Sequence, residues 1–190
     1  MTSSSARPGR LPVFVITGQS GAGKGTLIAR LLERFPQLRL AVSATTRPRR
    51  PGEVEGRHYY FIPEEEFERR LAAGEFLEYH AFPWGQRSGT LFSEIDRIAG
   101  EGGACVLELE TEGASNVADR VPGAITIFVT APLGELERRL RERATESAGE
   151  IGERLDVARE QAKVADRFDH VVENDDLERA VDELSGIGQG

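Results

Sequence analysis

A glycine-rich segment with a single lysine holds residue types that together bind phosphate groups. It reads Gly18-Gln19-Ser20-Gly21-Ala22-Gly23-Lys24-Gly25-Thr26. Glycine allows backbone angles that turn successive N–H groups inward, where they can surround phosphate oxygens. A lysine adds a compact positive charge on a flexible stem. Such a pattern indicates a phosphate site when a buried strand precedes it and a helix follows it.

The flanking sequence meets this condition. Residues 11–17 are an apolar run typical of a buried strand, and Leu27, Ile28, Leu31, Leu32 and Phe35 follow at helical spacing. The start of that helix adds unpaired N–H groups and the positive end of the helix dipole. The segment therefore predicts a P-loop for ATP or GTP, and we favour ATP.

One position departs from the general P-loop pattern. Gly25 follows the lysine at the place where Ser or Thr holds Mg²⁺. Thr26 comes one residue later, and we expect it to meet an α-phosphate. Because Mg²⁺ gives up its water reluctantly, we expect the ion to bind through the nucleotide and water, without a direct cage of protein side chains.

Composition excludes several other classes of protein. The 190 residues can bury one core, and the formal net charge of −8 argues against non-specific binding of nucleic acid. No apolar stretch approaches the length of a membrane span. The three histidines lack metal-ligand spacing, and the only cysteine, Cys105, lies in an apolar run. These features predict a cytoplasmic protein with a buried thiol.

The order of the predicted elements indicates an α/β fold. Apolar strands alternate with amphipathic helices, which favours a parallel sheet covered on both faces and ligands at the carboxyl ends of the strands. After the first strand and helix, the predicted strands are 38–42, 104–109, 124–129 and 170–173. The predicted helices are 93–99, 112–120, 132–143, about 150–165, and 175–184.

An insertion interrupts this alternation. Residues 44–56 lack periodicity and predict a loop, and short strands at 59–62 and 76–82 enclose a helix that opens at Pro63. We therefore predict a core domain from residues 10–43 and 91–184, with an α+β insertion over residues 44–90. Residues 1–9 and 185–190 are expected to form disordered tails.

Two clusters in and around the insertion suit a nucleotide. Arg47 and Arg50 lie in a stiff loop with two prolines, and an arginine fork can hold a phosphate with two hydrogen bonds. The alternative is a solvated basic loop. Glu78 lies near the end of a predicted strand, where its carboxylate could accept two N–H bonds from a guanine edge. The alternative is an ordinary surface glutamate.

Two further clusters lie in the core. Arg139 and Arg143 are four residues apart on one helix face, with Arg154 after a polar break, so that a phosphate between them would offset their repulsion. The alternative is a helix face balanced by its own glutamates. Glu108 and Glu110 share one face at the end of a buried strand, a place suited to contacts with Mg²⁺ or substrate; the alternative is an exposed edge.

From about Leu11 to Leu184 the chain closely resembles guanylate kinase, the P-loop nucleoside monophosphate kinase that makes GDP from GMP and ATP. The most specific segment of this resemblance is Ser43-Ala-Thr-Thr-Arg47-Pro-Arg-Arg50-Pro-Gly-Glu53. The resemblance implies a P-loop core, a GMP-binding insertion and a mobile lid within about residues 139–154. It also implies Mg²⁺ as cofactor, ATP with GMP or dGMP as partners, no nucleic acid or membrane, and a monomer or homodimer.

The resemblance also implies roles for single residues. The implied GMP contacts are Ser43, Arg47, Arg50, Tyr59, Glu78, Ser88, Thr90 and Glu110. On the ATP side, residues 18–26 are expected to hold the phosphates and Asn174 to lie beside the adenine ring. Lys24, Arg47, Arg139, Arg143 and Arg154 are the expected catalytic residues, because they would neutralise charge on the transferring group.

This chain departs from the family pattern on the GMP side. Ser88 stands where the family usually has a second phosphate-binding tyrosine, and we expect Arg87 to replace that contact. The common Asp-x-Asp-x-Gln-Gly is here Glu108-Leu-Glu110-Thr-Glu112-Gly113. Three other readings remain at this stage: a phosphokinase with a different acceptor, a binding module without catalysis, and a regulatory switch that hydrolyses nucleotide slowly. Base selectivity separates the first, and the retained P-loop argues against the second.

Overall fold

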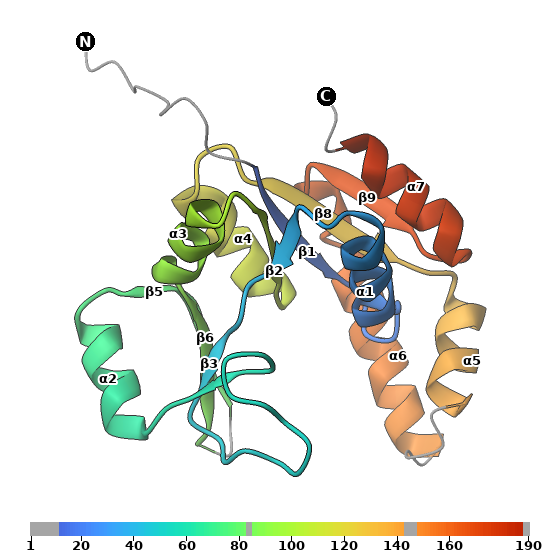
Figure 1. Ribbon diagram of the computed structural model, residues 1–190. Helices are drawn as coiled ribbons and strands as arrows, with labels where there is room; N and C mark the ends of the chain where they lie inside the picture. Colours follow the sequence, from blue (N-terminus) through green and yellow to red (C-terminus); the bar gives the residue numbers. More distant parts are fainter. Residues whose placement is uncertain (1–11, 83–84, 143–147, 188–190) are drawn as a thin grey trace.

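The computed structural model describes residues 12–82, 85–142 and 148–187, which form two sheets (Figure 1). The larger sheet has five parallel strands in the order β2-β7-β1-β8-β9. These strands are β1 (Val13–Gly18), β2 (Leu38–Leu40), β7 (Ala104–Glu108), β8 (Ile125–Thr130) and β9 (His170–Glu173). The predicted α/β fold with a central parallel sheet is confirmed.

Helices cover both faces of this sheet. Successive strand residues point to opposite faces, so Ile16 of β1 packs on one side with α1 (Lys24–Arg34), α5 (Leu133–Glu142), α6 (Ala148–Ala162) and α7 (Leu177–Ile187). Its neighbour Val15 packs on the other side with α3 (Phe92–Gly100) and α4 (Thr111–Arg120). A short 3₁₀ helix, Ala165–Arg167, precedes β9.

The smaller sheet has four strands in the order β4-β3-β6-β5 and lies in the range where the sequence predicts the insertion. Its elements are β3 (Ala44–Thr45), β4 (Tyr60–Phe61), α2 (Glu64–Ala72), β5 (Phe76–Ala81) and β6 (Arg87–Leu91). Phe67 of α2 is fully buried and stacks on Phe76, with ring centroids 4.3 Å apart. This sheet therefore has a small core of its own.

Apart from shifts of a few residues at element ends, the structure differs from the predicted elements in three places. Strand β3 occupies the start of the predicted 44–56 loop, because it pairs with β4 and β6 rather than following a local pattern. Strand β6 has no sequence pattern of its own and forms by pairing with β5. Helix α7 continues to Ile187, into the predicted tail, since the apolar side chain of Ile187 packs against the core. Residues 1–9 and 188–190 of the predicted tails lie outside the described residues.

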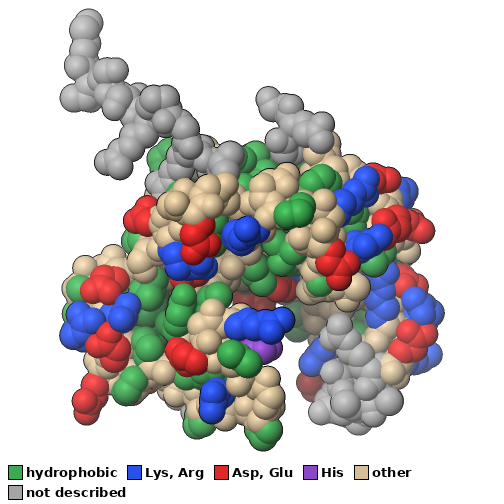
Figure 2. Space-filling model, viewed as in Figure 1, with side chains coloured by type: hydrophobic (Ala, Val, Ile, Leu, Met, Phe, Trp, Pro, Cys, Tyr) green, Lys and Arg blue, Asp and Glu red, His purple; other side chains and the backbone are tan. Residues whose placement is uncertain are grey.

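The large sheet with its helices forms a core lobe, and the small sheet with α2 forms an insertion lobe. A hollow lies between the insertion lobe and helices α5 and α6 of the core lobe. Figure 1 shows the small sheet and α2 on one side and α5 with α6 on the other, both extending from the edge of the large sheet that carries the start of α1. The space-filling view is hollowed between these two arms (Figure 2). Within the described part of the chain, no helix combines the length and apolar character needed to cross a membrane.

Phe128 on β8 and its paired residue on β9, Val171, should contribute very differently to the stability of the fold. Phe128 is fully buried on β8 and packs against Phe168, whereas Val171 on β9 is 45% exposed. We expect Phe128→Ala to lower the free energy of unfolding by about 3–5 kcal/mol, because it removes buried apolar surface and leaves a cavity. Val171→Ala, as control, should change it by less than about 0.5 kcal/mol. Urea unfolding of both variants measures this; equal losses would contradict the assigned core.

Candidate functional site

The P-loop follows β1 directly, and two of its glycines are required by close approach. A Cβ atom on Gly18 would lie 2.0 Å from the carbonyl oxygen of Val129, so only glycine allows β1 to meet β8 here. Gly23 has a φ of +80°, and a Cβ there would lie 2.9 Å from the Asn174 amide nitrogen. The loop can therefore turn into α1 while Asn174 packs against it.

Lys24 is the first residue of α1 and bends back over the loop. Its Nζ donates hydrogen bonds to the carbonyl oxygens of Gly18, at 3.0 Å, and Gln19, at 3.1 Å. A Cβ on Gly25 would meet no atom of the described structure within 4 Å. Space is thus open beside Lys24, and the glycine at position 25 is not a steric necessity.

Helix α6 supports the P-loop from behind. The buried side chain of Gln19 donates to the carbonyl of Ala158 at 3.0 Å and accepts from the N–H of Ala131 at 3.0 Å and from the Thr130 hydroxyl. The N–H of Ser20 donates to the Gln161 carboxamide at 2.8 Å. The loop is therefore tied to α6, to β8 and to the residue that follows β8.

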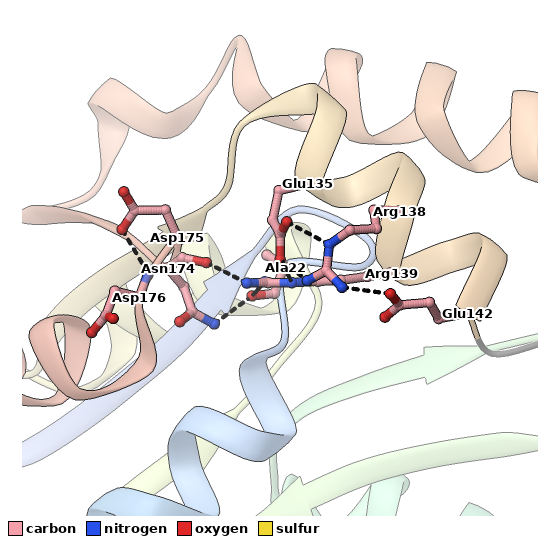
Figure 3. A network of polar contacts seen from close by, with 8 residues as sticks. All are labelled: Ala22, Glu135, Arg138, Arg139, Glu142, Asn174, Asp175 and Asp176. Carbon is pink, nitrogen blue, oxygen red and sulfur yellow. Dashed lines mark hydrogen bonds and ion pairs between the residues drawn. The ribbon is translucent and has the colours of Figure 1, made fainter.

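Arg139 reaches from α5 to the P-loop (Figure 3). Its guanidinium donates to the carbonyl oxygens of Ala22, at 3.0 Å, and Asn174, at 2.8 Å, and to Glu135 on its own helix at 2.7 Å. Asn174 donates its amide N–H to the same Ala22 carbonyl at 2.7 Å. The buried Oδ1 of Asn174 has no hydrogen-bond partner among the described residues, so an acceptor is available beside the loop.

The other arginines of α5 behave as the alternative reading expects. Arg138 pairs with Glu135 and Glu142, and Arg141 pairs with Glu137, so glutamates of the same helix balance both charges. Hydrogen bonds from Arg138 lower the pKa of Glu135 to about 2, with a further contribution from Arg139. Arg154 lies exposed on α6, and the predicted partner Arg143 lies outside the described residues.

A cavity of about 410 Å³ lies in the insertion. Residues predicted to bind the GMP phosphate line it together with further polar and aromatic groups: Thr45, Arg47, Arg50, Tyr59, Phe82, Gln86 and Ser88. Strand β3, strand β6 and the loop after β3 thus bring together side chains more than 40 positions apart in the sequence.

Arg47 is held in this cavity by an acid and two rings. Its guanidinium binds both carboxylate oxygens of Glu53, at 2.8 and 2.5 Å, and lies 5.0 Å from the Tyr59 ring centroid and 5.6 Å from that of Phe61. Hydrogen bonds from Arg47 and from the Arg50 N–H hold the pKa of Glu53 at about 2. Such bidentate pairing uses the geometry with which arginine also binds phosphate.

The expectation that Arg87 replaces the missing tyrosine contact is wrong. Its guanidinium pairs with Glu64, at 3.1 Å, and Glu68, at 2.5 Å, and lies over the Phe67 ring. Side chains alternate along β6, so Arg87 faces α2 while the next residue, Ser88, lines the cavity. Gln86, two residues before Ser88, lines the same cavity and carries an amide that can donate to an anion.

Glu78, Thr90 and Ser43 form one polar group at the junction of the lobes. The Thr90 N–H donates to Glu78 at 2.9 Å, and the Ser43 and Thr90 hydroxyls lie 3.2 Å apart. A Cβ on Gly113 would lie 3.2 Å from the Glu78 carboxylate, so this glycine leaves room for it. Burial raises the pKa of Glu78, and hydrogen bonds from Thr90 oppose the rise only in part.

Glu108 connects the P-loop with this group. The residue is exposed at the end of β7, as the alternative expects. Partial loss of water around the carboxylate raises its pKa, the positive charge of Lys24 opposes the rise, and the neighbouring Glu110 adds to it. A second cavity, of about 110 Å³, is lined by Glu108 and by Ser43, Tyr59 and Thr90, together with Leu40, Ala41, His58 and Leu107. Glu110 is the N-cap residue that precedes α4, beyond the end of β7, and is not among the residues that line this cavity.

The sequence model of the guanylate kinase family matches residues 10–188. The chain belongs to this family. A guanylate kinase of Symbiobacterium thermophilum is 44% identical over 176 residues, which cover 92% of this chain and 83% of that protein. A guanylate kinase of Rubrobacter xylanophilus is 46% identical over 186 residues, which cover 95% of this chain and 94% of that protein.

Solved structures agree with this family membership. The crystal structure of guanylate kinase from Anaplasma phagocytophilum has a TM-score of 0.70 at 27% identity, and the match covers 94% of this chain and 85% of that one. Shikimate kinase from Bacteroides thetaiotaomicron has a TM-score of 0.51 at 14% identity, over 93% of this chain and 97% of that one. The second likeness shows only a shared fold.

Several residues of the site were not predicted as contacts from the sequence. Gln86 lines the larger cavity, and Glu53 was noted only as part of the family motif. Gln161 supports the P-loop from about 140 positions away. A polar residue close to Ser88 was a usable signal for Gln86, whereas nothing local distinguishes Gln161 from other polar residues of α6.

The contacts of Gln19 predict that removing its side chain lowers both stability and ATP binding. Gln19→Ala leaves the Ala158 carbonyl, the Ala131 N–H and the Thr130 hydroxyl without this partner. Each buried group so orphaned costs about 1–3 kcal/mol, so we expect lower stability in urea unfolding and weaker ATP binding in calorimetry. Glu160→Gln, which changes an exposed residue of α6, is the control and should alter neither. Unchanged ATP binding in Gln19→Ala would show that this support is not needed.

Proposed function

We propose that this chain transfers the γ-phosphate of ATP to GMP or dGMP, giving ADP and GDP or dGDP. One observation carries the proposal beyond family membership. Glu108 ends β7, which pairs with β1 just before the P-loop, and it also lines a cavity with Ser43, Tyr59 and Thr90 of the insertion side. A donor held on the P-loop and an acceptor held by the insertion would therefore meet at one place.

On the acceptor side, the proposed roles follow from charge and hydrogen-bonding capacity. Arg47, Arg50 and Tyr59 would hold the GMP phosphate in the 410 Å³ cavity, with Ser88 as a shorter hydroxyl partner. The Glu78 carboxylate would accept N–H bonds from the guanine ring nitrogen and amino group. Thr90 and Ser43 would contribute hydroxyls beside the base. An acceptor without these two N–H groups would leave the half-buried carboxylate with only its hydrogen bonds from Thr90.

On the donor side, the P-loop N–H groups and Lys24 would bind the ATP phosphates. Arg139 already lies against the loop, and we propose that Arg143 and Arg154 join it when the lid closes. The unpartnered Asn174 Oδ1 is placed to accept a hydrogen bond, and an adenine amino group would supply one. The P-loop carbonyls that now hold Lys24 compete weakly with phosphate, because a charged oxygen is the stronger acceptor.

Mg²⁺ fits this site as an ion carried mainly by the nucleotide. The described residues contain no group of three or more His, Cys, Asp or Glu that could hold a metal ion. Glu108, which interacts with Lys24, is the oxygen-bearing residue we propose for contact with the ion through water, whereas Thr26, near the start of α1, would meet an α-phosphate. When bound with ATP, the ion would supply charge neutralisation and polarisation of phosphate oxygens.

The transfer itself needs position and charge rather than a covalent enzyme group. The GMP phosphate is largely ionised near neutral pH, so its oxygen can attack the γ-phosphate in line without a general base. Lys24 and the arginines would neutralise the charge that spreads over the transferring group. Closure of the insertion and lid would exclude water and so prevent hydrolysis of ATP.

The proposal predicts strict selectivity for guanine acceptors. We expect ADP formation from MgATP with GMP and dGMP, but not with AMP, UMP or CMP. Lys24→Ala should lower turnover on the order of 10²–10³-fold, because a charge on the transferring phosphate is lost. Glu78→Ala should lower kcat/KM for GMP by at least about tenfold, the value of one hydrogen bond to a charged group, while KM for ATP stays unchanged. Val171→Ala serves as the matched control.

Two results would contradict the proposal. ATP binding without turnover on GMP would exclude this acceptor. Equal turnover on all five monophosphates would exclude Glu78 as the group that selects the base.

The raised pKa of Glu78 predicts a dependence on pH. Because burial raises this pKa, the folded protein protonates Glu78 at a higher pH than it would an exposed glutamate. A protonated carboxyl accepts fewer N–H bonds, so GMP binding should weaken as pH falls through this value.

The measurement compares kcat/KM for GMP in the wild type and in Glu78→Gln from about pH 8 to about pH 5. The GMP phosphate titrates near pH 6, but it does so equally with both proteins. We expect the advantage of the wild type to shrink toward low pH. A constant ratio would mean that ionised Glu78 does not bind the base.

A further inference from the structure

Glu94 is a buried carboxylate that neither the P-loop nor the phosphate cavity uses. It lies on α3, the core helix that follows β6 directly, and its side chain is 4% exposed. A charge is expensive to bury unless several groups hydrogen-bond to it. The groups that bind the Glu94 carboxylate therefore indicate which segments it holds in place.

Four hydrogen bonds satisfy this carboxylate. One oxygen accepts from the Val42 N–H at 2.9 Å and from Arg97 at 2.9 Å. The other accepts from the Tyr60 hydroxyl at 2.9 Å and from Arg97 at 3.0 Å. Burial raises the pKa of Glu94, but these bonds outweigh it and leave the pKa below its usual value. The group is therefore a charged acceptor at neutral pH.

The two partners outside α3 belong to the connection between the lobes. Val42 lies in the segment that leads from β2 into the insertion, and Tyr60 lies on β4 of the small sheet. Glu94 thus joins a core helix to both the entry segment and a strand of the insertion. Arg97 completes the group from one turn further along α3.

Each of these partners is next in sequence to a proposed GMP contact. Val42 precedes Ser43, and Tyr60 follows Tyr59. The Tyr60 N–H also donates to the Ser43 carbonyl at 2.9 Å, which ties the two segments together. Ser43 and Tyr59 both line the 110 Å³ cavity beside Glu108. Glu94 therefore holds the Val42 backbone beside Ser43 and the Tyr60 side chain beside Tyr59.

We propose that Glu94 is a positioning residue for the acceptor site, acting through Val42 and Tyr60 on Ser43 and Tyr59. This role rests on the proposed function, since it concerns GMP binding. The P-loop and its supports on α6 make none of these contacts, so ATP binding does not depend on Glu94.

The test uses two variants of the full chain and one control. Tyr60→Phe removes only the hydroxyl that Glu94 accepts, and Glu94→Gln keeps the size of the side chain but removes its charge. Glu101→Gln is the matched control, because Glu101 is an exposed partner of the same Arg97, at 2.9 Å. Dissociation constants for GMP and for ATP are measured separately by calorimetry, alongside KM, kcat and the midpoint of thermal unfolding.

We expect Tyr60→Phe to weaken GMP binding about 3–10-fold and Glu94→Gln more strongly, while ATP binding stays within about twofold. The double variant should lose less than the product of the two single losses, because both changes remove the same bond. Glu101→Gln should leave both ligands unaffected. A change shared equally by GMP and ATP, or confined to the unfolding midpoint, would overturn the positioning role.

Ligand binding by the wild type distinguishes a failure of this proposal from a failure of the proposed function on which it rests. If the wild type binds ATP but not GMP, the proposed acceptor is wrong and the role of Glu94 at its site is overturned with it. If the wild type and both variants bind GMP equally well, the acceptor stands and the role of Glu94 alone is overturned.

Discussion

A site for two phosphate-bearing molecules must concentrate positive charge before either molecule arrives, and the rest of this structure serves that constraint. Three cations of the site rest on acceptors of the protein. Lys24 rests on P-loop carbonyls, Arg47 on Glu53, and Arg139 on Glu135 with the carbonyls of Ala22 and Asn174. Most of these acceptors are neutral carbonyls, which hold a cation in place and yield to a phosphate that carries full charge. These acceptors thus offset part of the repulsion among the cations, while the cations stay available to a phosphate.

The parallel sheet makes this arrangement possible. Strand β1 lies between β7 and β8, so the P-loop and Glu108 emerge at the same edge of the sheet. Gly18 fits so closely to Val129 that the loop has one route into α1. Strand β6 attaches the insertion to the core at that edge, because it runs directly into α3.

The sequence predicted the parts of the site that depend on local pattern. The P-loop follows from its glycines, its lysine and the flanking apolar periodicity, and Arg47 and Arg50 follow from a specific motif. Arg87 was misassigned because a side chain's direction on β6 is decided by pairing with β3 and β5, which no local pattern reveals. The contacts of Gln19 with Ala158 and of Ser20 with Gln161 were equally hidden, since they join segments that meet only after the sheet has formed. The roles of the individual site residues stay predictions.

Glu53 shows why the acceptor side is built from a paired arginine rather than an isolated one. An unpaired guanidinium in a half-buried loop would either extend into water or bind any passing anion. The bidentate Glu53 keeps Arg47 folded against Tyr59 and Phe61, in a plane that a phosphate can also use. A phosphate that enters must compete with this carboxylate, so the charge of Arg47 alone gives little binding. If Glu78 and Thr90 contact the base as proposed, those contacts rather than the charge of Arg47 would decide the selection for guanine.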